Sequence, residues 1–197
     1  MEDLSGEECF LRGVQHLNGC CDALEPNTDL AMEYAIQAHK KGYISAAGLI
    51  GSLYEEGKGV PQSWEKAFEW YMKSATLGDA RAQYNVANAY CLGGQGVGQD
   101  LVLSFEWFLK AAEQGFPEAQ YRVGRCYGLG EGVKVDDRLY YQYCLKAADQ
   151  GYAEAQYEVG YCLRRGEGIE KDEKEAFEWY SKAARQQHPK AQFEIGT

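Results

Sequence analysis

One short motif occurs four times in this chain at a nearly fixed spacing, and this repetition constrains the fold more than any other feature. The copies read A-A-G-L-I-G from Ala46, A-Q-Y-N-V-A from Ala82, A-Q-Y-R-V-G from Ala119 and A-Q-Y-E-V-G from Ala155. Successive copies therefore start 36, 37 and 36 residues apart. A period of this length is typical of repeat proteins, in which each unit packs mainly against its neighbours. We therefore expect stacked units rather than one globular core.

Each repeat is predicted to form two antiparallel helices. In the first helix, Ala119, Val123 and Tyr127 share one stripe at helical spacing, so this stripe is expected to be buried. A small residue recurs within the stripe, which predicts close approach of the two helices of a unit; it is Gly51, Ala87, Gly124 or Gly160. The second helix carries an aromatic motif such as A-F-E-W-Y from Ala67.

The starts of the second helices are marked by residues that favour the N-cap position. These residues accept hydrogen bonds from the free amides of a first turn, and they are Ser63, Asp100, Asp136 and Asp172. Asp172 is also followed by Glu175 at the spacing of a full capping box. We interpret these aspartates as structural caps and not as catalytic groups.

The repeat boundaries predict one all-α solenoid domain, residues 1–197, built from stacked antiparallel helix pairs. Four full repeats are expected at 44–79, 80–116, 117–152 and 153–188. A degenerate unit at 8–43 precedes them, and 189–197 opens a partial repeat of about two turns. Terminal units of repeat arrays often depart from the consensus in this way.

The acidic composition argues against two classes of partner. Thirty acidic and 20 basic side chains give a formal net charge of −10, whereas nucleic acids and anionic membranes are bound by clustered Lys and Arg. A basic or neutral protein partner fits better, although the charge is also explained by the solubility of a tyrosine-rich array. No apolar stretch approaches the ~20 residues of a membrane span, and the acidic start lacks the apolar core of a secretory signal. We therefore expect a cytoplasmic protein.

The cysteines do not form a disulfide framework. There are seven, and Cys126 and Cys162 occupy the same slot of neighbouring repeats. Equivalent helices lie about 8–10 Å apart, beyond the reach of a disulfide, so both are predicted to be free thiols. Cys20 and Cys21 are adjacent and awkward to bridge. This pattern favours a reducing compartment.

Nothing in the sequence has the spacing of an active site. The three histidines, His16, His39 and His188, lie in different units, and no His or Cys pair has metal-ligand spacing. The glycine-rich segment 93–96 lacks the Lys-Ser/Thr of a phosphate loop. Glu55 and Glu56 are interpreted as solvated loop charges. We expect no catalytic residue, cofactor or metal; a hydrolase remains a remote third hypothesis.

The repeated pattern resembles a known family. It reads A-x-A-Q-Y-x-[VL]-G-x-x-Y-x-x-G-x-G-V, then D-x-x-K-A-F-E-W-Y-x-K-A-A-x-Q-G, and is similar to the Sel-one-like repeat, related to tetratricopeptide repeats. The resemblance is strong over 44–188 and weaker over 8–43. It implies a right-handed superhelix and a non-enzymatic adaptor or scaffold role. Some relatives are secreted with a disulfide in every unit, but those slots here hold Ala112 with Gln120, and Ala148 with Gln156.

The resemblance also implies where a protein or peptide segment would bind. The first helices of such arrays line a concave groove, through the Tyr of A-Q-Y, the next residue and the one three further on. In this chain these slots hold Tyr84, Asn85, Asn88, Tyr121, Arg122, Arg125, Tyr157, Glu158 and Tyr161. Tyr and Arg are enriched at binding hot spots, and Asn side chains can hold an extended backbone.

Arg122 and Arg125 lie one helical turn apart, which suggests a site for a carboxylate. Two alternatives remain open. The tyrosines of this set can pack between adjacent first helices, and the arginines can pair with nearby acids such as Glu118. A different functional hypothesis is an assembly subunit, since Phe193 and Ile195 on the partial repeat favour weak self-association through that end.

Overall fold

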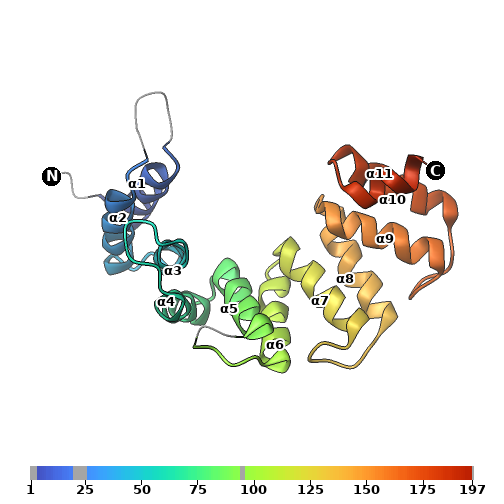
Figure 1. Ribbon diagram of the computed structural model, residues 1–197, viewed down its shortest axis with the longest axis horizontal. Helices are drawn as coiled ribbons and strands as arrows, with labels where there is room; N and C mark the ends of the chain where they lie inside the picture. The colour runs from blue at the N-terminus through green and yellow to red at the C-terminus, as the bar shows by residue number, and fades with distance from the viewer. Residues whose placement is uncertain (1–3, 20–25, 94–95, 197) are drawn as a thin grey trace. The chain divides into compact units, whose positions relative to one another are not determined.

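The computed structural model describes residues 4–19, 26–93 and 96–196, and these residues form helices joined by short loops (Figure 1). The all-α prediction of stacked helix pairs is confirmed, and the partial repeat forms a short helix of its own. The helices are α1 (Gly6–Asn18), α2 (Thr28–Lys40), α3 (Ser45–Glu56), α4 (Trp64–Thr76), α5 (Ala80–Leu92), α6 (Leu101–Glu113), α7 (Pro117–Leu129), α8 (Asp137–Asp149), α9 (Ala153–Arg165), α10 (Glu173–Arg185) and α11 (Pro189–Gly196).

The chain divides into two compact units, Met1–Gln99 and Asp100–Thr197. The first unit contains α1 to α5 and the second contains α6 to α11. Within each unit, every helix packs against the next one along the chain. This nearest-neighbour packing is the arrangement expected of stacked repeats.

The predicted N-caps are confirmed. The side chains of Ser63, Asp100, Asp136 and Asp172 each accept a hydrogen bond from a backbone amide in the first turn of the helix that follows. The capping box expected at Asp172 does not form, because the carboxylate of Glu175 accepts a bond from the indole of Trp179 at 3.3 Å. A reciprocal capping box is present instead between Ser5 and Glu8 at the start of α1.

The small residues of the first helices mark close approaches, as predicted. A Cβ atom added to Gly51 would lie 2.7 Å from the ring of Tyr71, and one added to Gly160 would lie 2.8 Å from the ring of Tyr180. Real Cβ atoms do not approach other atoms so closely, so only glycine fits against these rings. The aromatic side chains of the second helices are thereby seated directly on the backbone of the first helices.

In three repeats, the loop between the first and second helix lies in close contact with the preceding repeat. Its second glycine has a φ near +70°, and a Cβ there would overlap the first residue of the previous second helix. The three contacts join Gly59 to Thr28, Gly132 to Leu101 and Gly168 to Asp137. They are contacts with backbone atoms, so they set the stacking of the repeats without any particular side chain.

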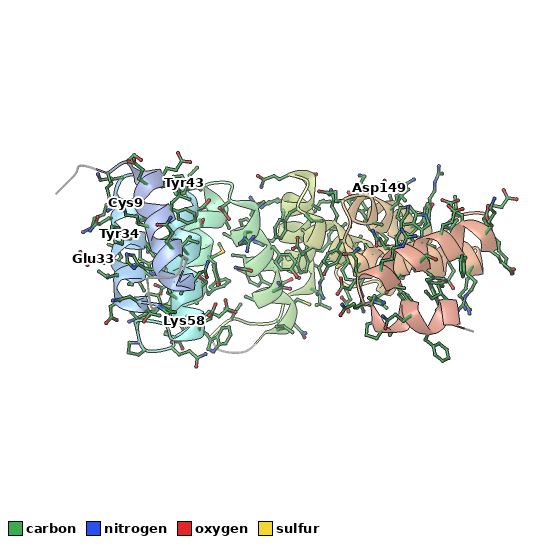
Figure 2. All side chains as sticks on the ribbon, turned by 90° about the horizontal axis from the view of Figure 1, so that it is seen from above. Cys9, Glu33, Tyr34, Tyr43, Lys58 and Asp149 are labelled. Carbon is green, nitrogen blue, oxygen red and sulfur yellow. The ribbon has the colours of Figure 1, made fainter. Side chains whose placement is uncertain are left out.

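The buried cysteines belong to the cores between helices. Cys9 packs with Ala38 and Ala46, and the rings of Tyr34 and Tyr43 lie around them (Figure 2). Cys126 and Cys162 are buried and form no disulfide, which confirms their prediction as thiols. Burial raises the pKa of Cys162 to about 12, so this thiol stays protonated at neutral pH. Cys20 and Cys21 lie outside the described residues.

Candidate functional site

The candidate site is carried by the first helices, and a buried glutamine fixes the rotation of each one. The side-chain amides of Gln83, Gln120 and Gln156 donate to the carbonyl oxygens of Ala75, Ala112 and Ala148, at 3.2–3.3 Å. Each bond adds a side-chain donor to a carbonyl in the last turn of the preceding second helix, which also accepts from the backbone amide of the turn glycine at 2.9–3.0 Å. The tyrosine that follows each glutamine is therefore held at one fixed position.

In the second unit, two of these glutamines also accept a hydrogen bond from another glutamine. Gln150 donates to the side-chain oxygen of Gln120 at 2.7 Å, and Gln186 donates to that of Gln156 at 2.9 Å. The bonded pairs are therefore repeated 36 residues apart. This polar ladder fixes the first helices relative to the helices that precede and follow them.

In the first unit, the predicted residues Asn85 and Asn88 lie near the side chain of Tyr71. The hydroxyl of Tyr71 donates to the carboxylate of Glu55 and is also hydrogen-bonded to the side chain of Asn85. Burial and the bond to Glu55 raise the pKa of Tyr71, and the bond to Asn85 opposes part of that rise. Asn88 lies nearby in the wall of the same pocket, whereas Tyr84 is half-buried.

This pocket has a volume of about 180 Å³ and lies between the repeats of 44–79 and 80–116. Its walls combine apolar rings and aliphatic groups with one carboxylate and two amides. The lining residues are Glu55, Trp64, Ala67, Phe68, Tyr71, Asn85, Asn88, Ala89, Leu92, Gly93 and Val97. A few polar groups within an apolar concavity are the usual composition of a site that orients a bound group.

In the second unit, three predicted residues are brought together. The Arg125 guanidinium is hydrogen-bonded to the hydroxyl of Tyr121, and Glu158 acts electrostatically on both. Glu158 also accepts a bond from Tyr140 at 2.6 Å. Burial raises the pKa of Tyr121, with Glu158 adding to the rise; for Arg125, burial lowers the pKa, but Tyr121 and Glu158 raise it by more.

The other predicted residues of the second unit also make contacts outside this network. Arg122 stacks its guanidinium over the ring of Phe108 at 4.9 Å. Tyr157 packs between the rings of Tyr180 and His188, with centroids 5.5 and 4.9 Å away. Tyr161 lies under the guanidinium of Arg165 at 5.5 Å.

The packing alternative therefore holds for two of the tyrosines. Tyr157 contacts the rings just described, and Tyr121 packs against Tyr152, with centroids 5.3 Å apart. Neither ring is fully exposed for a partner. For Arg125, the interacting groups are Tyr121 and the acids Glu158 and Glu131 rather than Glu118.

Sequence reasoning missed Glu55, and the expectation that it is a solvated loop charge is wrong. It lies in the last turn of α3 and accepts from a buried tyrosine on α4. Tyr140 was missed as well. The alignment of the repeats could have revealed it. Tyr140 occupies the position of Ala67, and Cys144, one helical turn later, occupies the position of Tyr71. The large and the small residue have therefore changed places.

Two kinds of feature are absent from the described residues. No helix there combines the length and the apolar character that a bilayer span requires. Over the same ranges, no three His, Cys, Asp or Glu side chains gather in an arrangement that would hold a metal ion.

The family follows from a match over the helix pairs just described. The family model for the Sel1 repeat matches residues 6–43, 44–79, 80–116, 117–152 and 153–188. The chain belongs to the Sel1 repeat family. Proteins with Sel1 repeats generally mediate protein–protein interactions and serve as non-catalytic scaffolds.

Two solved Sel1-type structures are similar over almost the whole chain. A Sel1 repeat protein from Oxalobacter formigenes is 28% identical with a TM-score of 0.90, over 98% of this chain and 77% of that one. The protein c5321, a protective antigen of uropathogenic Escherichia coli, is 31% identical with a TM-score of 0.87, over 97% of this chain and 40% of that one.

Among curated proteins, the chitin synthase regulator SKT5 of Saccharomyces cerevisiae is 33% identical over 81 residues. The match covers 40% of this chain and 12% of the yeast protein. The chain therefore corresponds to a small part of that relative and to less than half of c5321.

Proposed function

We propose that this Sel1 repeat protein is a non-enzymatic adaptor that binds a segment of another protein through half-buried side chains of its first helices. Of the residues predicted above, the leading binding residues are Asn85 and Asn88 in the first unit and Arg122 and Arg125 in the second. Tyr121 and Tyr157 pack against other rings instead. The supporting observation is the network of Tyr121, Arg125 and Glu158. A guanidinium already held by neighbours loses less conformational freedom on binding, so it contributes more to affinity.

Peptide selection tests the adaptor proposal directly. A phage library of random linear peptides is selected on the wild-type protein, and the enriched peptides are measured on Arg122→Ala/Arg125→Ala. We expect enrichment of peptides with an acidic side chain or a free C-terminal carboxylate, and about tenfold weaker binding to the variant.

The matched control removes the same charge from a second helix. Arg138→Ala/Lys146→Ala changes two exposed cations of α8, so its affinities should stay within about twofold of wild type. Equal affinities for wild type and Arg122→Ala/Arg125→Ala would reject this placement of the site.

One observation favours a second candidate function, assembly through the partial repeat. On α11, the side chain of Phe193 is 71% exposed and that of Ile195 is 37% exposed. Exposed apolar side chains on a helix that can continue a stack would pair with another helical surface. Light scattering across concentration tests this candidate, which requires an association that is lost in Phe193→Ser/Ile195→Ser.

A further inference from the structure

The pocket of the first unit has features that select one kind of occupant. We propose that it binds the cationic side chain of a lysine or arginine from the partner polypeptide. The proposal rests on the adaptor function for the identity of the partner, and on the pocket itself for the chemistry. Three features carry it: an aromatic wall, a carboxylate on that wall, and the charges nearby.

The wall is formed by rings from α4. Trp64, at 40% exposed, Phe68 and Tyr71 all line the pocket. Phe68 is held in place by an edge-to-face contact with Tyr90, with centroids 5.6 Å apart. Aromatic faces attract ammonium and guanidinium groups, and they also pack against the aliphatic stem of a lysine or arginine.

The carboxylate of Glu55 supplies the counter-charge. A carboxylate can accept about four hydrogen bonds. The hydroxyl of Tyr71 provides one of them, which also holds Glu55 against the pocket wall. Asn85 and Asn88 add amide oxygens in the same lining, so a cation with several N–H donors would find several acceptors.

The surrounding charges leave this site negative. Glu55 and Glu56 are the charged groups that act on Tyr71, and both raise its pKa. Glu56 is paired with Lys58 at 2.5 Å, so the negative charge that acts in the pocket is chiefly that of Glu55, which lines it. The Lys66 ammonium lies over the ring of Tyr54 at 5.3 Å. The formal charge of −10 over the whole chain adds to the attraction of a basic segment.

We call the tyrosine of the second helix and the side chains around it a layer. The second unit contains two further layers, around Tyr140 and Tyr180, and neither has a glutamate at the position of Glu55. Around Tyr140, the slot of Glu55 is Gly128, and the tyrosine ring lies against that glycine. Around Tyr180, the slot of Glu55 is Arg164, which pairs with Glu194 at 2.5 Å. Cation binding is therefore assigned to the first unit, where carboxylate and aromatic wall occur together.

Nuclear magnetic resonance of the tryptophan indoles tests the proposal with small probes. The 15N-labelled protein is titrated with N-acetyl-lysine methylamide and, as the neutral match, with N-acetyl-norleucine methylamide. Trp64→Phe identifies the Trp64 signal. We expect a saturable shift of this signal with the lysine probe and at least about fivefold weaker binding of the norleucine probe.

Glu55→Gln keeps an acceptor for Tyr71 but removes the charge, so we expect about tenfold weaker binding of the lysine probe. Glu69→Gln removes the same charge from the exposed face of α4, and binding should stay within about twofold. Circular dichroism melting confirms that both variants are folded. Equal binding of the two probes, or unchanged binding to Glu55→Gln, would overturn the proposal.

The outcomes separate this inference from the adaptor function. If the lysine probe binds as expected but no peptide is selected, the pocket stands and the adaptor proposal fails. If peptides are selected and depend on Arg122 and Arg125, while Trp64 does not respond to the lysine probe, the adaptor stands and the cation pocket is rejected.

Discussion

The layer around Tyr71 in the first unit and the layer around Tyr140 in the second are built from equivalent sequence positions, but they differ in shape. In the first, a small Ala67 and a large Tyr71 leave a pocket beside Glu55. In the second, Tyr140 replaces the alanine, Cys144 replaces the tyrosine, and Gly128 replaces the glutamate. The tyrosine hydroxyl still reaches a carboxylate, but this carboxylate is Glu158 of the next repeat.

The comparison teaches that these two layers keep a tyrosine hydroxyl bonded to a carboxylate while the positions of both groups change. A ring can move by one helical turn if the residues it leaves and meets change together. Cys144 is fully buried, and Gly128 contacts the relocated ring, so the three positions of the second layer are coupled. Coupled positions give substitution effects that do not add, and this can be measured.

The largest effect is expected when only one of the two exchanged residues of the second layer is changed back. Cys144→Tyr would place a second ring where Tyr140 already packs, and we expect a loss of about 3 kcal/mol in the free energy of unfolding. Adding Tyr140→Ala should recover most of that loss, because the first unit uses this pair of residues at Ala67 and Tyr71. Urea unfolding measures both variants, and a double variant less stable than the single one would contradict the coupling.

Alanine in place of glycine compares the two ring positions directly. In Gly51→Ala, the new Cβ would lie 2.7 Å from the Tyr71 ring, whereas in Gly128→Ala it would lie 3.3 Å from the Tyr140 ring. The helix propensity gain of about 1 kcal/mol is the same in both. We expect Gly51→Ala to destabilise by about 2 kcal/mol and Gly128→Ala to be nearly neutral in urea unfolding. Equal changes in the free energy of unfolding would show that the distance from the new Cβ to the tyrosine ring does not determine the effect.

The buried glutamine should matter equally in both units. Gln83→Leu and Gln156→Leu each remove a buried hydrogen bond to a helix-end carbonyl that keeps its backbone donor, so we expect a loss of about 0.5–1.5 kcal/mol in each. Chemical denaturation of the two variants, with the exposed Gln142→Leu as control, measures the effect. A loss of stability at only one position would show that the glutamine bond stabilises the fold in that unit alone.

Alkaline pH should weaken both layers. The folded-state pKa values of Tyr71 and Tyr140 are raised, chiefly by burial and then by their carboxylate partners. Their contribution is fully present below the ordinary tyrosine pKa of about 10 and is lost as the pH rises above it, because the unfolded chain ionises first. Unfolding free energies measured from pH 8 to 11 should fall less steeply in Tyr71→Phe and Tyr140→Phe. A slope unchanged in either variant would contradict the assignment for that tyrosine.

The smallest effect is expected at the turns that follow the second helices. Gly78 has a φ of +97° at the turn after α4, whereas the same slot after α10 is Gln187 with a φ of +64°. A residue with a side chain is strained there, so Gln187→Gly should stabilise by about 0.5–1 kcal/mol. Thermal melting detects this gain, and Gln142→Gly, within the exposed face of α8, should instead destabilise.

The fold could be predicted from sequence because each of its determinants repeats. The small residue of the first helix and the aspartate or serine cap of the second recur in register, so one unit explains the others. The capping box at Asp172 was predicted wrongly, since Glu175 has a competing donor in Trp179, one turn further along the same helix. Local spacing gives the possible partners of a side chain, and packing chooses among them.

The site was only partly predictable. Asn85, Arg125 and Glu158 do interact with residues of other helices, but the decisive partners, Tyr71 and Tyr140, come from the second helices. Their hydroxyls cross from one repeat to the next, and no spacing within a single repeat reports such a contact. The role of the A-Q-Y glutamine was missed for the same reason, since its acceptor lies at the end of the preceding repeat.

The backbone contact of Gly132 with Leu101, repeated by Gly168 with Asp137, bears on how such a gene can change. Because the partner atoms are main-chain atoms, the residue facing the glycine is free to mutate without a matching change across the junction. At these junctions, a unit can then be exchanged for another copy without loss of the backbone contact. A joint of this kind permits the number of units to change.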